Sequence, residues 1–317
     1  MAALVRLTTV LLLILGLGGC SRLLFHPASH WYQSPAQQGL EYQDVVLVHP
    51  DGLRLHAWWL PAQGASRGTV YFLHGNGQNV STHLSSVQWL PQQGFNVLML
   101  DYRGYGLSEG KARYPAVMAD TQLGLDWIVN EQSAQGPVTV FGQSLGGALA
   151  ARLMAEPDNQ GKAACVVLEA SFASYRGITR DVMSQSWLLW PFKGLTALGM
   201  PNASHDPEAW VGDISPTPLL IMHSEDDPIV PFRHGERLKE AAQPPVSLLT
   251  LSGPHIAGLA DSRVRQQMVN FMREHQCRRT FPRPARSESG NDTRNGVSNG
   301  APNGVVPVPQ PPQNYSF

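Results

Sequence analysis

The spacing of hydrophobic residues changes near residue 60, and this change predicts a sheet built from two kinds of strand. Residues 41–49 and 53–60 alternate apolar and polar positions on either side of the sequence PDG, which predicts an antiparallel β-hairpin. Further along, the apolar positions form short continuous runs, which are typical of strands buried on both faces of a parallel sheet. These runs are residues 69–73, 95–100, 138–141, 164–168, 218–222 and 246–251.

Segments with apolar residues at helical spacing separate most of these runs. They are residues 81–93, 114–131, 145–155, 232–242 and 261–274. Buried strands that alternate with helices predict an α/β fold. Its central sheet is mostly parallel, the antiparallel hairpin stands at its start, and helices cover both faces.

One connection is much longer than the others: about 45 residues separate the strand that ends near residue 168 from the next one. An insertion of this length is usually functional or a small subdomain, and we expect a short helical lid at about 172–214. Its apolar side chains suit either a cover over a hydrophobic substrate or packing of the insertion onto the sheet. These side chains are Trp187, Leu188, Leu189, Trp190 and Phe192.

The N-terminus has the features of a secretory signal peptide, which we place at residues 1–19. Arg6 precedes an apolar run at 7–19 that is too short to span a bilayer. The sequence LGGC, which ends at Cys20, resembles the bacterial lipobox. This resemblance implies that Cys20 is lipidated and anchors the protein to the membrane. An ordinary signal peptide that leaves Cys20 unmodified is the alternative.

The expected organisation of the mature chain is a tether at 20–39, one domain at 40–275 and a disordered tail at 276–317, which is rich in Pro, Asn and Gly. Ser21 follows the lipobox-like cysteine, whereas in enterobacteria an aspartate there favours the inner membrane. We therefore expect a bacterial cell-envelope protein on the periplasmic face of the outer membrane.

Composition narrows the range of partners. The chain has 317 residues with a formal net charge of -1, so it lacks the basic footprint of a DNA- or RNA-binding protein. No C-x-x-C or H-E-x-x-H spacing occurs, and we expect neither a metal ion nor a cofactor. Cys165 lies in an apolar run, and whether it pairs with Cys277 stays open.

The candidate chemistry begins with the sequence GQSLG at 142–146, a G-x-S-x-G motif between a predicted strand and a predicted helix. A serine hydroxyl is a poor nucleophile at neutral pH, so Ser144 needs a base and an acid that orients the base. Asp227 and His255 follow later strands, at the sheet edge where Ser144 is expected, and are the candidate acid and base. The backbone amides of Asn76 and Leu145 are the candidate oxyanion donors.

Residues from about 68 to 273 resemble the α/β-hydrolase superfamily, in the branch that contains monoglyceride lipase-like and serine aminopeptidase-like members. The matching pieces are HGNGQN, LDYRGYGLSEG, GQSLGG, LEASFAS, HSEDDPIVP and GPH, in this order. In the family pattern H-G-x-x-D-x-x-V-P the aspartate is the acid, which corresponds to Asp227 when His223 is counted first. Ser224 stands where the family usually has glycine.

Each assignment has a rival. Asp226 adjoins Asp227, and Glu169 also follows a strand, so either is an alternative acid. Asp101 and Arg103 are interpreted as a charge pair that braces a loop beside the site. The remaining histidines of interest are expected to be surface or structural residues or to shape loops: His49, His56, His74, His205, His223 and His234.

Together these features predict a serine hydrolase that cleaves a carboxylic ester through an acyl-enzyme intermediate. The resemblance implies a small-molecule or lipid ester as substrate, such as an acyl glycerol or a lysophospholipid. Two alternatives stay open: an amide or peptide hydrolase of the same fold, and a non-catalytic, membrane-anchored binding protein.

Overall fold

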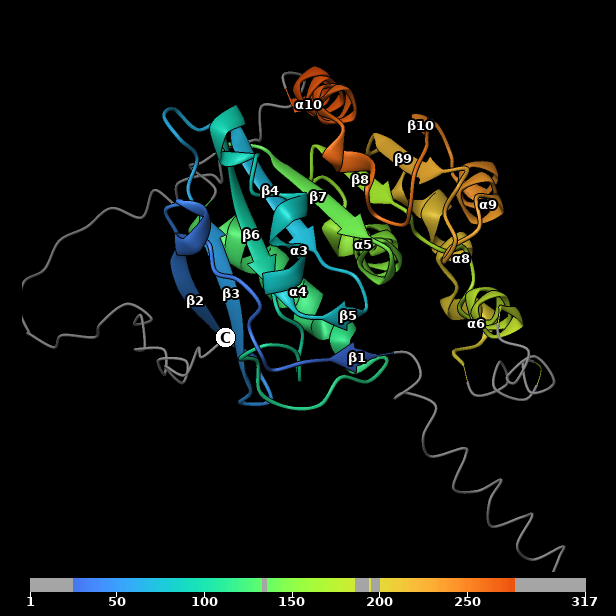
Figure 1. Cartoon of the computed structure of the whole chain (residues 1–317), viewed down its shortest axis with the longest axis horizontal. Coiled ribbons are helices and arrows are strands. Elements are labelled where there is room, and N and C mark those ends of the chain that lie inside the picture. Colours follow the sequence, from blue (N-terminus) through green and yellow to red (C-terminus); the bar gives the residue numbers. More distant parts are fainter. Residues whose placement is uncertain (1–24, 133–135, 186–193, 195–199, 277–317) are drawn as a thin grey trace, which may run out of the picture.

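The computed structural model describes residues 25–132, 136–185, 194 and 200–276, and within these ranges the main element is a mixed sheet of eight strands. Figure 1 shows this twisted sheet running across the molecule from β2 to β10. Its strands are β2 (Gln43–Val48), β3 (Arg54–Leu60), β4 (Gly68–Leu73), β6 (Phe95–Leu100), β7 (Val138–Gln143), β8 (Cys165–Glu169), β9 (Leu219–Ser224) and β10 (Val246–Leu251). The short strands β1 (His26–Pro27) and β5 (Gly77–Gln78) pair separately.

The strand order is β10-β9-β8-β7-β4-β6-β3-β2, and it confirms the expected α/β fold. β3 is antiparallel to both of its neighbours, β2 and β6, whereas every other pairing in this sheet is parallel. The hairpin predicted from alternation forms β2 and β3. The six continuous apolar runs form the other six strands, of which β4, β6, β7, β8 and β9 are buried along their whole length.

Helices follow most of the strands and cover both faces of the sheet. They are α3 (Val80–His83), α4 (Ala116–Glu131), α5 (Leu145–Ala155), α6 (Tyr175–Ser184), α8 (Pro207–Trp210), α9 (Arg233–Ala241) and α10 (Ser262–Gln276). Shorter 3-10 turns are η1 (Ala36–Gln38), η2 (Leu84–Ser86), η3 (Pro91–Gln93), η5 (Pro157–Asn159), η7 (Ala203–His205), η8 (Val211–Ile214) and η9 (Gly258–Ala260).

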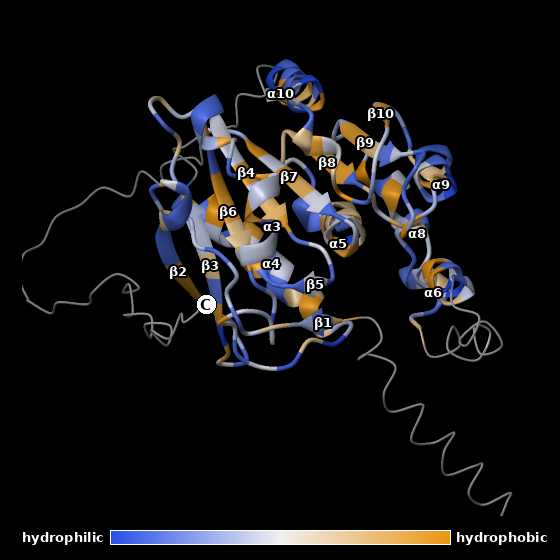
Figure 2. Cartoon of the chain, in the orientation of Figure 1, coloured by the Kyte–Doolittle hydropathy of each residue, from blue (hydrophilic) through white to orange (hydrophobic). Residues whose placement is uncertain are grey.

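Two hydrophobic clusters, one on each face, hold the helices to the sheet. One contains the apolar side chains of α4 and α5, and the other contains those of α3, η2 and α10. Figure 2 shows apolar residues concentrated in the central strands and α5, while α9 and α10 carry many polar residues. Because strand side chains alternate between faces, successive residues of one strand enter different clusters.

Residues 81–93, which were expected to form one helix, instead form the separate turns α3, η2 and η3. Asn79 caps the first turn by accepting a hydrogen bond from the Ser81 amide at 2.9 Å. Pro91 starts η3, and because proline has no amide proton a regular helical ladder cannot continue through it.

The segment expected as a tether differs as well, because its described part, residues 25–39, packs onto the domain. Phe25 and Trp31 are buried, and the Trp31 ring lies 5.0 Å from that of Trp58 in β3. β1 adds a further contact by pairing in parallel with β5. The folded domain therefore begins before residue 40.

Other expectations fall outside the described residues or only partly within them. The insertion contributes α6, η7, α8 and η8, but its aromatic stretch 187–192 is not described. The proposed signal peptide, Cys20, Cys277 and residues 277–317 are not described either. Within the described ranges, no helix has the length and hydrophobicity needed to cross a bilayer.

Candidate active site

Ser144 lies between β7 and α5 with a strained backbone, at φ 52° and ψ -115°. L-residues other than glycine rarely adopt positive φ, and holding one there costs on the order of 1–3 kcal/mol. The Ser144 amide donates a hydrogen bond to the Glu169 carbonyl at 2.9 Å, which fastens the turn to the end of β8. The turn therefore presents the serine hydroxyl in a fixed place at the start of α5.

The glycines around the serine are required by close packing. A Cβ atom at Gly142 would lie 2.3 Å from the Gly146 carbonyl oxygen, and one at Gly146 would lie 1.9 Å from the carbonyl oxygen of Leu73. A Cβ at Gly147 would lie 2.6 Å from the Cβ of Ser171. Only glycine lets the first turn of α5 approach the end of β4 this closely.

Asp227 and His255 come together from the loops that follow β9 and β10. The Nδ1 atom of His255 lies 2.7 Å from Oδ2 of Asp227, whose side chain is fully buried. Oδ1 of Asp227 accepts hydrogen bonds from the amides of Ile229 and Val230 at 2.8 and 2.9 Å. Burial raises the pKa of Asp227, but His255 and these amides outweigh burial and lower it below its usual range.

The two rival acids have other contacts. Asp226 is exposed, and its carboxylate accepts a hydrogen bond from the Gly253 amide at 3.2 Å. Glu169 is buried and accepts a hydrogen bond from the side chain of Gln143 at 2.6 Å. Burial raises the pKa of Glu169 to about 7. Of the three carboxylates, the structure places only that of Asp227 in hydrogen-bond contact with a histidine ring.

Of the two predicted oxyanion donors, Asn76 lies in the loop between β4 and β5, and Leu145 is the first residue of α5. No described group accepts a hydrogen bond from the amide of Asn76 or of Leu145, and Leu145 belongs to the first turn of α5, where amides lack helical partners. Asn76 is held from two sides. The Tyr105 hydroxyl donates to its carbonyl oxygen at 2.9 Å, and the His26 amide donates to its Oδ1 at 2.9 Å.

These two supports of Asn76 were not predicted from the sequence. Tyr105 lies within the motif LDYRGYGLSEG, and its place in that motif is the only signal that pointed toward the site. His26 lies in the segment expected as a tether, where nothing in the sequence indicates a contact with a loop about 50 residues away.

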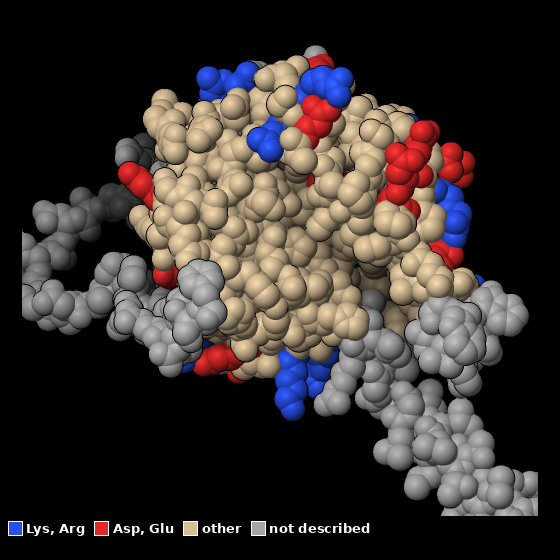
Figure 3. All heavy atoms as spheres, in the orientation of Figure 1, with Lys and Arg blue, Asp and Glu red and all other residues tan. Residues whose placement is uncertain are grey.

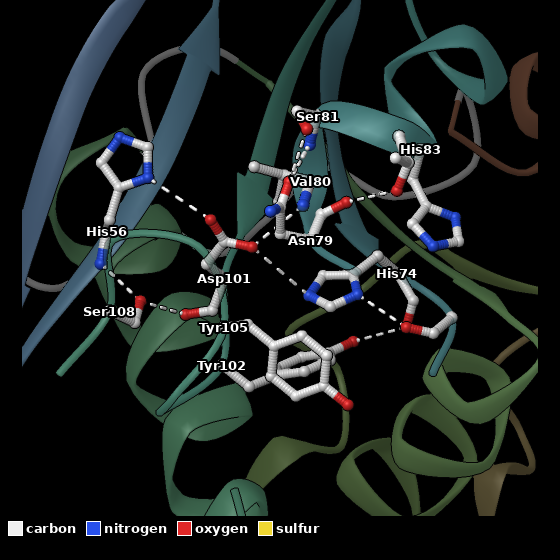
Figure 4. A network of polar contacts seen from close by, with 12 residues as sticks. His56, His74, Asn79, Val80, Ser81, His83, Asp101, Tyr102, Tyr105 and Ser108 are labelled. Atoms are coloured by element: carbon white, nitrogen blue, oxygen red, sulfur yellow. Dashed lines mark hydrogen bonds and ion pairs between the residues drawn. The ribbon is translucent and has the colours of Figure 1, made fainter. Parts of the chain in front are cut away.

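Figure 4 shows a polar network centred on Asp101 that includes His74, the first residue of the loop that leads to Asn76. Oδ1 of Asp101 accepts a hydrogen bond from the Val80 amide at 2.9 Å and lies 3.7 Å from Nε2 of His74. Oδ2 lies 3.6 Å from Nδ1 of His56. Burial lowers the pKa of His74, whose Nδ1 lies 2.7 Å from the Gly75 carbonyl oxygen. Asp101 and His74 therefore hold the start of this loop in place.

The expected pairing of Asp101 with Arg103 does not form, and that interpretation was wrong. Arg103 instead binds Asp120 through Nε at 2.9 Å and Nη2 at 2.6 Å, and Nη1 lies 3.2 Å from Asp51. The sequence interval was misleading because residues two apart in an irregular loop after a strand can point to opposite sides.

The remaining histidines considered above contact side or main chains near them. Nε2 of His223 lies 2.8 Å from the Val230 carbonyl oxygen, which shapes the loop that carries Asp227. The others pair with side chains other than those of Ser144, Asp227 and His255: His49 with Asp51, His56 with Asp44, His205 with Tyr114 and His234 with Asp181.

A pocket of about 690 Å³ connects the site residues. Ser144, His255 and Asn76 all line it, together with apolar side chains such as Ile229 and Leu259. The structure brings Ser144 and His255 to the wall of one pocket without a hydrogen bond between their side chains. Such contacts are often long before substrate binds. Among the described residues, no group of three or more His, Cys, Asp or Glu could hold a metal ion.

The sequence matches one family model and is similar to several known proteins. The family model described as serine aminopeptidase, S33, matches residues 64–209. The protein YfhR of Escherichia coli strain K12 is 33% identical over 240 residues, which cover 73% of this chain and 80% of YfhR. The α/β-hydrolase domain-containing protein WAV2 of Arabidopsis thaliana is 32% identical over 227 residues, covering 67% of this chain and 71% of WAV2.

Two further similarities involve proteins whose names state an activity. The lysophosphatidylserine lipase ABHD12 of Xenopus tropicalis is 30% identical over 251 residues, covering 68% of this chain and 62% of ABHD12. The esterase Pf2001 of Pyrococcus furiosus has a similar structure, with a TM-score of 0.68 and 22% identity over 80% of this chain and 98% of the esterase. At that identity the structural likeness shows the fold alone.

Proposed function

The chain belongs to the α/β-hydrolase family, and we propose that it is a serine hydrolase that cleaves carboxylic esters through an acyl-enzyme intermediate. The contact between Asp227 and His255, on the wall of the pocket that also exposes the strained Ser144, supports this proposal most strongly. A nucleophile, a base and a buried orienting carboxylate are the three parts that acyl transfer requires.

In the first half of the proposed reaction, the Oγ atom of Ser144 attacks the ester carbonyl carbon while Nε2 of His255 takes the hydroxyl proton. The carbonyl electrons move to its oxygen, which accepts hydrogen bonds from the amides of Asn76 and Leu145. Asp227 holds the imidazole in one orientation and stabilises its positive charge. The bond between the carbonyl carbon and the alcohol oxygen then breaks, and His255 gives its proton to the departing alcohol.

In the second half, a water molecule attacks the acyl-serine carbonyl and gives its proton to His255. The new tetrahedral intermediate collapses by breaking the bond to Ser144, whose oxygen takes the proton back. The products are a carboxylic acid, an alcohol and the free enzyme. Each oxyanion donor contributes about 3 kcal/mol of transition-state stabilisation in this kind of site.

Two observations favour an ester of moderate size as substrate. The pocket volume of about 690 Å³ lies in the range of sites for small molecules, and Ile229, Ile256 and Leu259 give part of its wall an apolar surface. The similarity to ABHD12, named as a lysophosphatidylserine lipase, and to an esterase fold is in keeping with acyl glycerols, lysophospholipids or small esters.

Labelling of the full-length protein with a fluorophosphonate probe tests the serine mechanism. We expect the parent protein to be labelled and Ser144→Ala to lose labelling together with hydrolysis of p-nitrophenyl esters. Ser252→Ala is the matched control, because Ser252 is exposed three residues before His255. The proposal fails if the parent protein is not labelled or if Ser144→Ala keeps its esterase activity.

A second comparison tests the class of bond that is cleaved. We expect p-nitrophenyl butyrate to be hydrolysed and amino acid p-nitroanilides to be left intact, because alcohols leave more readily than amines. Faster cleavage of the anilides would instead support a peptidase. No hydrolysis of either substrate and no probe labelling would support a binding protein that has kept the fold.

We also propose that the protein is anchored through lipid on Cys20 to the periplasmic face of a bacterial outer membrane, because the sequence before this cysteine resembles a lipobox. Anchoring by several acyl chains is stable at roughly 0.8 kcal/mol per buried methylene. Cys20→Ala should release the protein from membranes, and globomycin should block its processing. Membrane association that is unchanged by both treatments would reject the anchor.

A further inference from the structure

One end of the pocket lies between α3 and η2 on one side and η9 with the start of α10 on the other. Thr82, Ser85 and Gln88 line the first side, and Leu259 and Arg265 line the second. Arg265 is the only Lys, Arg, Asp or Glu among the described residues that line the pocket. This end of the pocket therefore combines hydroxyl and amide groups with a single permanent charge.

The side chain of Arg265 is held in place by uncharged partners. Its Nε atom donates a hydrogen bond to the Leu259 carbonyl oxygen, and its guanidinium carbon lies 5.6 Å from the centre of a Trp89 ring. No described carboxylate lies within ion-pair distance of it. Neighbouring Arg263 differs, because its guanidinium binds Asp261 at 2.7 Å and thereby occupies that carboxylate.

Among the described residues, the wall of the pocket carries no other permanent charge. Figure 3 shows a broad uncharged area across the centre of this view, with Lys, Arg, Asp and Glu gathered near the margins. The carboxylate of Asp227 is buried and is already hydrogen-bonded to His255 and to two backbone amides, so it is not a partner for Arg265. The pocket side of the Arg265 guanidinium is thus without a protein counter-ion among the residues that the structure describes.

We propose that Arg265 binds an anionic group of the substrate, a carboxylate or a phosphate, so that the preferred substrates are esters that carry a negative charge. This inference rests on the proposed ester hydrolysis. The two Nη groups of arginine match the paired oxygens of carboxylate and phosphate, and the planar ion tolerates partial burial better than an ammonium does. Ser85 and Gln88 also line the pocket and supply further hydrogen-bond donors.

Two matched pairs of esters test the proposal with the full-length protein. p-Nitrophenyl butyrate and mono-p-nitrophenyl succinate differ by a carboxylate on the acyl side. 1-Octanoylglycerol and 1-octanoylglycerol 3-phosphate differ by a phosphate on the alcohol side, and both are used below their micelle concentrations. We expect the charged member of one pair to have the higher kcat/KM, and that pair identifies the side of the ester on which the anion lies.

Substitution of the arginine gives the decisive measurement. Arg265→Gln should lower kcat/KM for the preferred charged ester by about 10- to 100-fold, mainly through KM, because a charge-assisted hydrogen bond is lost. The value for the neutral partner should change by less than about 3-fold, since it makes no such bond. Arg265→Lys should restore part of the preference, and Arg263→Gln should leave it intact.

Salt dependence of the parent protein keeps the proposal testable if Arg265→Gln does not fold. Raising the ionic strength should lower kcat/KM for the charged ester and leave the neutral ester unchanged. The inference is overturned if neither charged ester is preferred, or if the preference survives in folded Arg265→Gln. Either result leaves the proposed function standing as long as Ser144 is required for neutral ester hydrolysis. Loss of that requirement refutes the proposed function itself.

Discussion

A methyl group added at Gly146 tests whether contact between α5 and the end of β4 sets the geometry of the site. The new Cβ would lie 1.9 Å from the Leu73 carbonyl oxygen and 2.6 Å from that of His74, whereas ordinary contacts begin near 3.4 Å. Both obstacles are backbone atoms, so no rotamer change can relieve the overlap. The start of α5 and the end of β4 would have to separate by more than ~1 Å.

This separation would act directly on the proposed oxyanion donors. Leu73 and His74 lead into the loop that carries Asn76, and Gly146 follows Leu145 in the chain. A displacement of about 1 Å in catalytic geometry typically lowers the rate by about 100-fold. Overpacking of this kind also destabilises a fold by about 1–3 kcal/mol. Gly146→Ala should therefore lower kcat for p-nitrophenyl butyrate about 100-fold and reduce Tm by several degrees.

The neighbouring glycine provides a control that can be rescued. A Cβ at Gly147 would meet the Cβ and Oγ of Ser171 at 2.6 and 2.7 Å, and the next atom, the Gly142 carbonyl oxygen, is 3.3 Å away. As a single variant, Gly147→Ala should thus be less stable than the parent protein. The double variant Gly147→Ala/Ser171→Gly should regain most of this stability. Gly146→Ala should gain nothing from Ser171→Gly. Near-parental activity of Gly146→Ala, or equal rescue of both variants, would refute this account of the turn.

Three further predictions concern buried charge. Asp227→Asn should lower kcat by about 10⁴-fold because the amide cannot orient and stabilise the His255 imidazolium. Asp226 is exposed, and Asp226→Asn should change kcat less than about 3-fold. Ester assays that find the reverse order would contradict the assignment. Asp120→Ala should lower the free energy of unfolding by about 3–5 kcal/mol in urea, since it leaves a buried guanidinium without its main partner, yet leave KM unchanged. Burial raises the pKa of Glu169 from 4.5 to about 7. Between these two pH values the folded protein holds a proton that the unfolded chain releases. The contribution of this group to stability therefore falls as pH rises from 4.5 through 7. Glu169→Gln should therefore gain up to about 3 kcal/mol over the parent at pH 8 and little at pH 4, and an equal difference at both pH values would refute the shift.

The sheet could be predicted from the sequence because burial of a strand on both faces leaves a pattern in its own residues. The runs that became β4 and β7 are apolar without interruption, and strand ends mark where loops must begin. The same reasoning placed Ser144, Asp227 and His255 at one edge of the sheet. Their meeting there follows from parallel strands, which bring successive loops to the same side.

Contacts made by isolated residues leave no such pattern. Trp31 and Phe25 pack onto the domain from a segment without apolar periodicity, and their partners are decided only in the folded protein. Arg103 binds Asp120 and not Asp101, although Asp101 is nearer in the sequence, because α4 places the Asp120 carboxylate next to the guanidinium. Arg265 could not be placed in the pocket either, since its position depends on how α10 packs beside η9 and β8.

The pairing of β1 with β5 limits how far the pocket can lie from the proposed lipid anchor. His26 is six residues beyond the proposed lipid anchor at Cys20, and its amide is bound to the side chain of Asn76. Six residues of fully extended chain reach at most about 20 Å. In an acylated protein the pocket would therefore lie within a short distance of the lipid headgroups, so membrane-resident esters would be met at a high local concentration and esters in bulk solution only by diffusion to the surface.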